Sequence, residues 1–302
     1  MRAFDTIRRN GADAWNLFVL PLSLALLPWS LSFRAARLLA QHARLFRAEA
    51  DAAWTNAAPF CADSDEGEWK FGYRLVRWVE RIDTFLTLTR SPAWWRRRVD
   101  VTGDLPPSAA PGMLLTFHWG AGHWLWRLFV HRGIRAHFLA RRPQALDHGR
   151  GRVALWYAQL RGRALRRIGS LGVLYTGGSA KRVAEALAAG EGVVGMLDLP
   201  AEDAQRAQRV PLLGRVARLP SGLLEIARAQ NAPVRLLSCG LDTRSGRRLL
   251  QVEELPPALS VHELLARYGA HLEGAVRRAP EAWQMWHVAP LIFVAEDSSG
   301  AA

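Results

Sequence analysis

The sequence predicts an α/β fold with a mostly parallel central sheet flanked by helices. From residue 113 to residue 278, short apolar runs alternate with segments of helical spacing, which is typical of a sheet covered by helices on both faces. The run Met113–Phe117 is entirely apolar or β-branched, as strands buried on both faces are. A chain of 302 residues, 50% of them hydrophobic, is long enough to enclose one sizeable core.

The N-terminal part of the chain has a different composition. No charged residue occurs from Trp15 to Phe33, a stretch just long enough to span a bilayer, although two prolines interrupt it. Residues 34–47 follow with the pattern of a basic amphipathic helix. We therefore expect residues 1–50 to form an apolar membrane-anchoring helical segment, and residues 51–302 to form a single α/β domain. The alternative is an ordinary buried pair of N-terminal helices.

The other elements follow from periodicity and from turn residues. Residues 54–66 resemble a loop, residues 68–90 have helical spacing, and Val99–Gly103 is typical of an edge strand and its turn. Beyond the central strand, the pattern predicts strands at Ile134–Leu139, Leu171–Tyr175, Val193–Leu197, Pro233–Cys239 and Leu249–Val252. It predicts helices at Arg150–Arg167, Ala180–Ala189, Ser221–Gln230 and Val261–Arg278.

The central strand leads directly into the residues most suggestive of chemistry. The run ends at His118, passes Gly120 and Gly122, and restarts with helical spacing at Trp124. A titratable ring at a strand-to-helix turn lies where open α/β sheets usually bind ligands. The glycines would let backbone N–H groups approach an oxyanion. The alternative is a structural histidine at a strand end.

Composition and motifs exclude several classes of function. The formal net charge is +13, but the arginines are scattered, so the sequence favours an anionic membrane, a phosphorylated lipid or an acidic carrier protein over nucleic acid. The two cysteines, Cys61 and Cys239, exclude a disulfide framework. Neither G-x-S-x-G nor H-E-x-x-H occurs, and the glycines between His118 and His123 disfavour a metal pair. We expect no metal and no cofactor. Acyl transfer with histidine as general base remains.

Several segments, in order, resemble one family. They are Leu114-Leu-Thr-Phe-His-Trp-Gly-Ala-Gly-His-Trp124, Glu185-Ala-Leu-Ala-Ala-Gly-Glu-Gly-Val-Val-Gly-Met-Leu-Asp198, Val210-Pro-Leu-Leu-Gly-Arg215, Ala279-Pro-Glu-Ala-Trp283 and Met285-Trp-His287. Together they resemble the late acyltransferases of lipid A biosynthesis, the lauroyl and myristoyl transferases of the lysophospholipid acyltransferase-like superfamily. The resemblance runs nearly end to end.

The resemblance implies a membrane-associated acyltransferase at the cytoplasmic face of a bacterial inner membrane. It would move an acyl chain from acyl carrier protein, or from coenzyme A, to a hydroxyl of a lipid or glycolipid. The acceptor would be lipid A-like or specialised, such as a pigment precursor. His118 would be the general base, and Arg141, Arg161, Arg163 and Asp198 would bind substrate.

The sequence departs from the family pattern at one important position. The family has an acidic residue five positions after the catalytic histidine, and this chain has His123 there. A neutral imidazole can orient His118 through a hydrogen bond but cannot supply the negative charge that stabilises an imidazolium. We assign His123 as the orienting partner on this basis. The alternative is a non-catalytic relative that binds acyl chains or carrier protein at the membrane.

Overall fold

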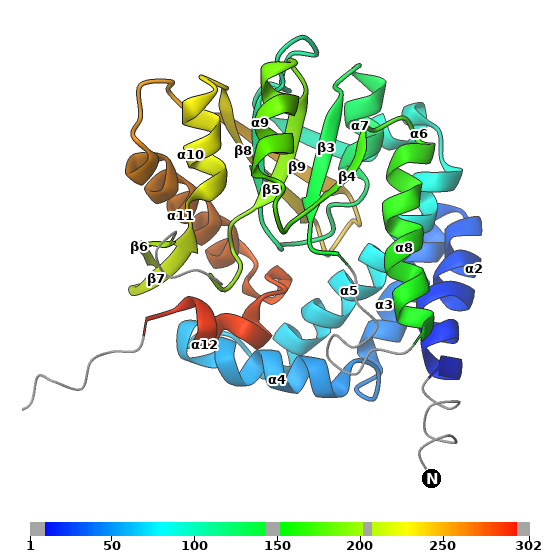
Figure 1. The fold of residues 1–302 in the computed structure, drawn as a ribbon. Coiled ribbons are helices and arrows are strands. Elements are labelled where there is room, and N and C mark those ends of the chain that lie inside the picture. Colours follow the sequence, from blue (N-terminus) through cyan, green and yellow to red (C-terminus); the bar gives the residue numbers. More distant parts are fainter. Residues whose placement is uncertain (1–9, 143–151, 202–206, 295–302) are drawn as a thin grey trace, which may run out of the picture.

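The computed structural model describes residues 10–142, 152–201 and 207–294. Its main sheet has seven strands in the spatial order β1-β9-β8-β2-β5-β3-β4, with helices around it (Figure 1). The strands are β1 (Val99–Thr102), β2 (Met113–Thr116), β3 (Ala136–Ala140), β4 (Gly172–Tyr175), β5 (Gly192–Met196), β8 (Val234–Leu241) and β9 (Arg248–Glu254). A separate antiparallel hairpin consists of β6 (Ala207–Leu212) and β7 (Arg215–Pro220).

The sheet is mostly parallel, which confirms the predicted fold class. Only the pair β8 and β9 is antiparallel; β1 pairs with β9 in parallel, and the block β8, β2, β5, β3 and β4 is parallel throughout. All four residues of β2 are buried, as its uninterrupted apolar run predicts. Parallel pairing brings the carboxyl ends of β2, β5 and β3 to the same edge of the sheet.

Helices cover the sheet and form a layer beneath that edge (Figure 1). The main helices are η1 (Trp15–Val19), α2 (Leu20–Leu26), α3 (Trp29–Gln41), α4 (Arg47–Ala57), α5 (Glu66–Thr89), α6 (Pro92–Arg96), α7 (Leu125–His131), α8 (Arg152–Arg167), α9 (Ala180–Ala188), α10 (Gly222–Ala229), α11 (Val261–Arg278) and α12 (Ala289–Ile292). The longest of these is α5, and α4, α5 and α12 lie below the strands in this view, with α8 beside α2.

Three segments differ from the sequence-based expectation. The expected loop at residues 54–66 is helical as far as Ala57, because the alanines of α4 pack into the core. The amphipathic helix begins at Trp29, directly after Pro28, and ends at Gln41 rather than continuing to residue 47. The hairpin of β6 and β7 was not predicted, since Pro211 and Pro220 weaken the strand signal of its two short segments.

The N-terminal helices pack on α5 and contribute to the core. Leu24, Trp29 and Phe33 are buried in the same hydrophobic cluster as the sheet. Arg90 donates to the carbonyls of Ala25 and Leu27, which satisfies the break between α2 and α3. Among the described residues, no helix is long and apolar enough to cross a membrane.

Candidate active site

His118 and Asp198 occupy matching positions on two neighbouring strands. The register of β2 and β5 pairs Thr116 with Met196, the last residue of each strand. His118 and Asp198 each lie two residues beyond the end of their strand. The side chains meet there, with His118 Nδ1 3.0 Å from Asp198 Oδ1. The prediction that His118 lies just beyond the carboxyl end of its strand is therefore confirmed.

Asp198 is completely buried, and its carboxylate is held by three donors. The backbone N–H of His118 donates to Oδ2 at 2.8 Å, and the indole N–H of Trp283 donates to the same oxygen at 3.0 Å. The other oxygen, Oδ1, accepts from the His118 ring. This corrects the expectation that Asp198 binds the acceptor, because a side chain with no exposed surface cannot contact one.

The pairing determines which nitrogen of His118 is available for chemistry. A carboxylate at Nδ1 requires the proton on that nitrogen, so Nε2 carries the lone pair. The His118 side chain retains 31% of its exposure, whereas Asp198 has none. Burial lowers the pKa of His118, but the charge and hydrogen bond of Asp198 raise it, and the net shift is upward. The raised pKa makes the imidazole a stronger proton acceptor, and the side chain is accessible from solvent.

His123 does not occupy the orienting position that the sequence analysis gave it. Asp198 holds Nδ1 of His118, so the orienting carboxylate comes from the end of β5 rather than from the same loop. The His123 side chain is buried, and its Nε2 has no hydrogen-bond partner within the described part of the chain. Burial, together with the charge of Arg161, lowers the pKa of His123 to about 3, so the ring stays neutral.

The loop that carries His118 is held by the C-terminal segment. Trp119 forms an antiparallel bridge with Trp283. The backbone N–H of Gln284 donates to the carbonyl of His118 at 2.7 Å, and its side-chain amide donates to the carbonyl of Gly120 at 2.7 Å. The segment that includes Ala279-Pro-Glu-Ala-Trp283 thus fixes the loop that carries His118 as well as the carboxylate of Asp198.

At Gly120, the turn after His118 packs closely against the backbone of Cys239 and does not form an oxyanion-binding site. Its φ is +70°, and a Cβ there would lie 2.2 Å from the carbonyl oxygen of Cys239. The N–H of Gly120 donates to the carbonyl of Ala282 at 2.9 Å. That N–H is therefore engaged by the protein and is not available to a substrate oxyanion.

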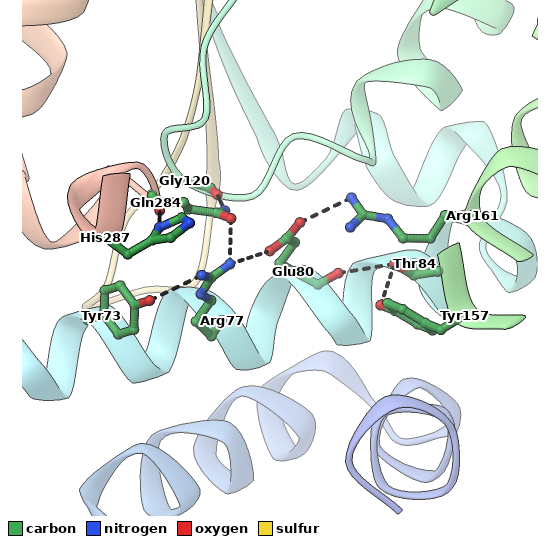
Figure 2. Close-up of polar contacts among 9 residues, drawn as sticks. All are labelled: Tyr73, Arg77, Glu80, Thr84, Gly120, Tyr157, Arg161, Gln284 and His287. Atoms are coloured by element: carbon green, nitrogen blue, oxygen red, sulfur yellow. Dashed lines mark hydrogen bonds and ion pairs between the residues drawn. The ribbon is translucent and has the colours of Figure 1, made fainter. Parts of the chain in front are cut away.

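A network of charged side chains lies beside the loop (Figure 2). Glu80 of α5 pairs with Arg161 of α8 at 3.0 Å and with Arg77 at 3.8 Å. Arg77 also donates to the side-chain oxygen of Gln284 at 2.7 Å. The charges of Glu80 and Arg77 act on His118, the first raising its pKa and the second lowering it. Arg161 keeps 35% of its side-chain exposure and is the member of this network nearest to solvent.

The three arginines expected to bind substrate are not all brought together. Arg161 belongs to the charged network around the site. Arg141 follows β3 at the same edge of the sheet, on the strand beyond β5, and is exposed. Arg163 is exposed on α8 two residues after Arg161, on a different face of the helix.

Comparison with known proteins shows a distant structural similarity. Neither a protein-family model nor a curated protein matches the chain. The chain is distantly similar to a solved acyltransferase structure. This is the 1-acyl-sn-glycerophosphate acyltransferase PlsC from Thermotoga maritima, which is 15% identical with a TM-score of 0.39 over 82% of this chain and 97% of the other. That similarity is too distant to assign a function, so the site itself must indicate one.

Several residues of the site were missed by sequence reasoning. Glu80 and Arg77 lie in the middle of an amphipathic helix, where charged residues usually face solvent. Tyr268 occupies an apolar position of α11 and was indistinguishable from a core residue. Trp283 was noticed only as part of a family-like segment. A usable signal existed for Asp198, since both it and His118 follow a buried strand directly.

Proposed function

We propose that this protein is an acyltransferase that uses His118 as a general base. The observation that supports the proposal is the His118–Asp198 pair, whose ring is held by a buried carboxylate on one side and is accessible on the other. This arrangement orients the imidazole and stabilises the imidazolium that forms when the base accepts a proton.

The proposed reaction is a direct transfer from a thioester to a hydroxyl. His118 Nε2 removes the proton of the acceptor hydroxyl while its oxygen attacks the thioester carbonyl, forming a tetrahedral intermediate. Collapse of the intermediate breaks the carbon–sulfur bond, and the leaving thiolate takes the proton from the imidazolium. The products are an ester and a thiol, and His118 returns to its starting state.

The cysteines do not support a covalent acyl-enzyme route. Burial raises the pKa of Cys239 to about 12 and that of Cys61 to about 11. Both thiols are therefore protonated near neutral pH, and a thiolate nucleophile would be required. This favours attack by the acceptor hydroxyl itself.

The positive charge supports an acidic or phosphate-bearing substrate. Arg161 is partly exposed within the charged network, and Arg141 and Arg163 are exposed on neighbouring elements. We propose acyl carrier protein, or else coenzyme A, as the donor, because both carry phosphate at the far end of the pantetheine arm that bears the thioester, and the carrier is acidic. A hydroxyl of a lipid or glycolipid is the proposed acceptor, lipid A-like or specialised.

We further propose that the N-terminal helices attach the protein to a membrane surface, at the cytoplasmic face of a bacterial inner membrane. Large apolar side chains are exposed along η1, α2 and α3 at helical intervals, and we name them the apolar stripe: Trp15, Val19, Leu22, Leu26, Leu27, Leu31 and Leu38. Arg34, Arg44 and Arg47 are exposed around its C-terminal end. Apolar burial combined with cationic flanks is what binds a helix flat on anionic lipid.

The catalytic proposal is tested with purified variants and acyl carrier protein loaded with chains of different length. We expect His118→Ala to lose about 100-fold to 10,000-fold in kcat, because a positioned base contributes that much. Asp198→Asn keeps the shape but removes the charge, and we expect a loss of similar size. His123→Ala should retain more activity than Asp198→Asn. His123→Glu restores the residue that the family uses, and it tests whether a charge at this buried position helps or disrupts.

Two outcomes would contradict the catalytic proposal. Full activity of Asp198→Asn would show that the pair does not act in catalysis. A wild-type protein that binds acyl carrier protein but transfers no acyl chain to any lipid hydroxyl would favour the binding-protein alternative.

The membrane proposal is tested by sedimentation with vesicles of phosphatidylethanolamine and phosphatidylglycerol. Leu22→Glu combined with Leu26→Glu should abolish binding, because both changes place charge in the apolar stripe. Leu291→Glu is the matched control, since Leu291 is as exposed as Leu26, at 68% against 66%, and lies on α12, away from α2 in Figure 1. Equal vesicle binding by the wild type, the Leu22→Glu/Leu26→Glu double variant and Leu291→Glu would show that the apolar stripe is not the membrane-binding surface.

A further inference from the structure

One hydroxyl group connects the two strands that carry His118 and Asp198. Tyr268 of α11 is fully buried beneath them. Its oxygen accepts hydrogen bonds from the backbone N–H of Leu197 and from that of Asp198, both at 3.1 Å. Its proton is donated to the carbonyl of Thr116 at 2.9 Å. Three backbone groups from two strands therefore share one phenol oxygen.

The position of this contact matters because the regular pairing of the strands ends there. Thr116 and Met196 are the last paired residues of β2 and β5. Beyond them the strands have no further partners in the ladder, and the next residues lead to His118 and Asp198. Without the phenol, two N–H groups at this point would be buried and unpaired, and the structure would have to shift to satisfy them.

We infer that Tyr268 is a positioning residue that fixes the Asp198 carboxylate against the His118 ring. The activity readout rests on the acyltransferase function proposed above, whereas the geometry does not. A merely structural role would predict a loss of stability without any change at His118. A positioning role predicts a change in the electrostatics of His118 as well.

The charges around His118 come from the end of β5 and from α5. Asp198 from β5 raises its pKa, Glu80 from α5 also raises it, and Arg77 from α5 lowers it. Tyr268 touches only the first of these groups. If it holds Asp198 in place, its removal should weaken the largest upward influence and leave the two from α5 unchanged.

The experiment compares Tyr268→Phe with Tyr157→Phe. Both changes delete a buried, hydrogen-bonded hydroxyl, but the hydroxyl of Tyr157 on α8 bonds Thr84, outside the His118–Asp198 pair. The pKa of His118 is measured by NMR titration, with its signal identified from the spectrum of His118→Ala. We expect Tyr268→Phe to lower the pKa of His118 by about one pH unit. We also expect kcat to fall by about tenfold or more, while KM changes by less than about threefold. Tyr157→Phe should change neither.

An unchanged pKa of His118 in folded Tyr268→Phe would overturn the inference, whatever happens to kcat. If Tyr268→Phe does not fold, a fluorinated tyrosine introduced at position 268 retains the shape and makes the oxygen a weaker acceptor. A lowered pKa of His118 in that protein supports the inference, and an unchanged pKa refutes it. Absence of acyl transfer by the wild type would count against the proposed function alone, because the NMR readout needs no substrate.

Discussion

The ion pair of Arg248 and Asp83 joins β9 to α5 inside the core, and its removal has a predictable pH dependence. Both side chains are completely buried and form two hydrogen bonds with each other. The Arg248 guanidinium also lies 3.8 Å from the ring centre of Trp29 on α3 and donates to the carbonyl of Gly246 at 2.9 Å. The change to consider is Arg248→Met, which keeps much of the volume and removes the charge.

Two contributions set the size of the effect. Losing the contacts with Trp29 and Gly246 should cost about 1–2 kcal/mol at any pH. Burial raises the pKa of Asp83 from 3.8 to about 6 even with Arg248 present, which lowers it. Without Arg248 this pKa rises further, and the carboxyl stays protonated in the folded state at neutral pH. Each pH unit above the wild-type value of about 6 then adds about 1.4 kcal/mol to the deficit.

The sign follows from proton binding. Above pH 6 the folded variant keeps a proton that the unfolded chain releases, so the stability of the variant falls relative to the wild type as pH rises. We expect a deficit of about 1–2 kcal/mol near pH 5 and about 4–5 kcal/mol near pH 8, in the range measured for broken buried ion pairs. Urea unfolding followed by tryptophan fluorescence at the two pH values measures both.

The matched control removes the carboxyl as well. Asp83→Leu in the Arg248→Met background should abolish the pH dependence of the deficit and recover most of the stability. Equal deficits of Arg248→Met near pH 5 and near pH 8 would refute the assignment of the effect to Asp83.

Three further predictions follow from other parts of the chain. Gly120→Ala should abolish activity and lower the melting temperature by several degrees, because its Cβ would meet the Cys239 carbonyl; a stable, active variant would contradict the close packing. Asp65→Ala should lower the free energy of unfolding by about 1 kcal/mol through loss of the N-cap of α5, and Asp65→Ser should restore most of it. The activity of the wild type should rise with pH through the raised pKa of His118, and Asp198→Asn should move that rise to lower pH; a profile that falls over the same range would exclude His118 as a base.

Local patterns in the sequence predicted most of the fold and the position of His118, one half of the His118–Asp198 pair. The strand before His118 is visible as a continuous apolar run, and the turn after it is visible as glycines, so position 118 could be placed without knowledge of the rest. The partner of His118 could not, because it depends on β5 lying next to β2, and these strands are separated by two other strands in the chain. The sequence suggested a neighbour five residues away. The fold instead provides one from 80 residues away, at the same register.

The other missed residues share a physical cause. Tyr268 and Trp283 look like core residues in the sequence because each presents a large apolar surface with a single polar atom. Whether that atom faces a backbone, a carboxylate or nothing is decided by how α11 and the segment after it pack on the sheet. Glu80 was hidden for the opposite reason, since a charge on a helix gives no indication that another helix supplies an arginine, Arg161, to pair with it.

The C-terminal segment that holds the His118 loop, with Trp283 and Gln284, determines how late in translation the site can form. When the ribosome has made the chain as far as Arg278, the end of α11, the strands that carry His118 and Asp198 already exist. The bridge to Trp119, the Gln284 bonds to the loop and the indole of Trp283 have yet to be synthesised. A nascent or prematurely terminated chain therefore holds an unsupported histidine and an incompletely bonded carboxylate. We expect such chains to lack a complete site. Only chains translated past Gln284 contain every residue that holds His118 and Asp198 in place.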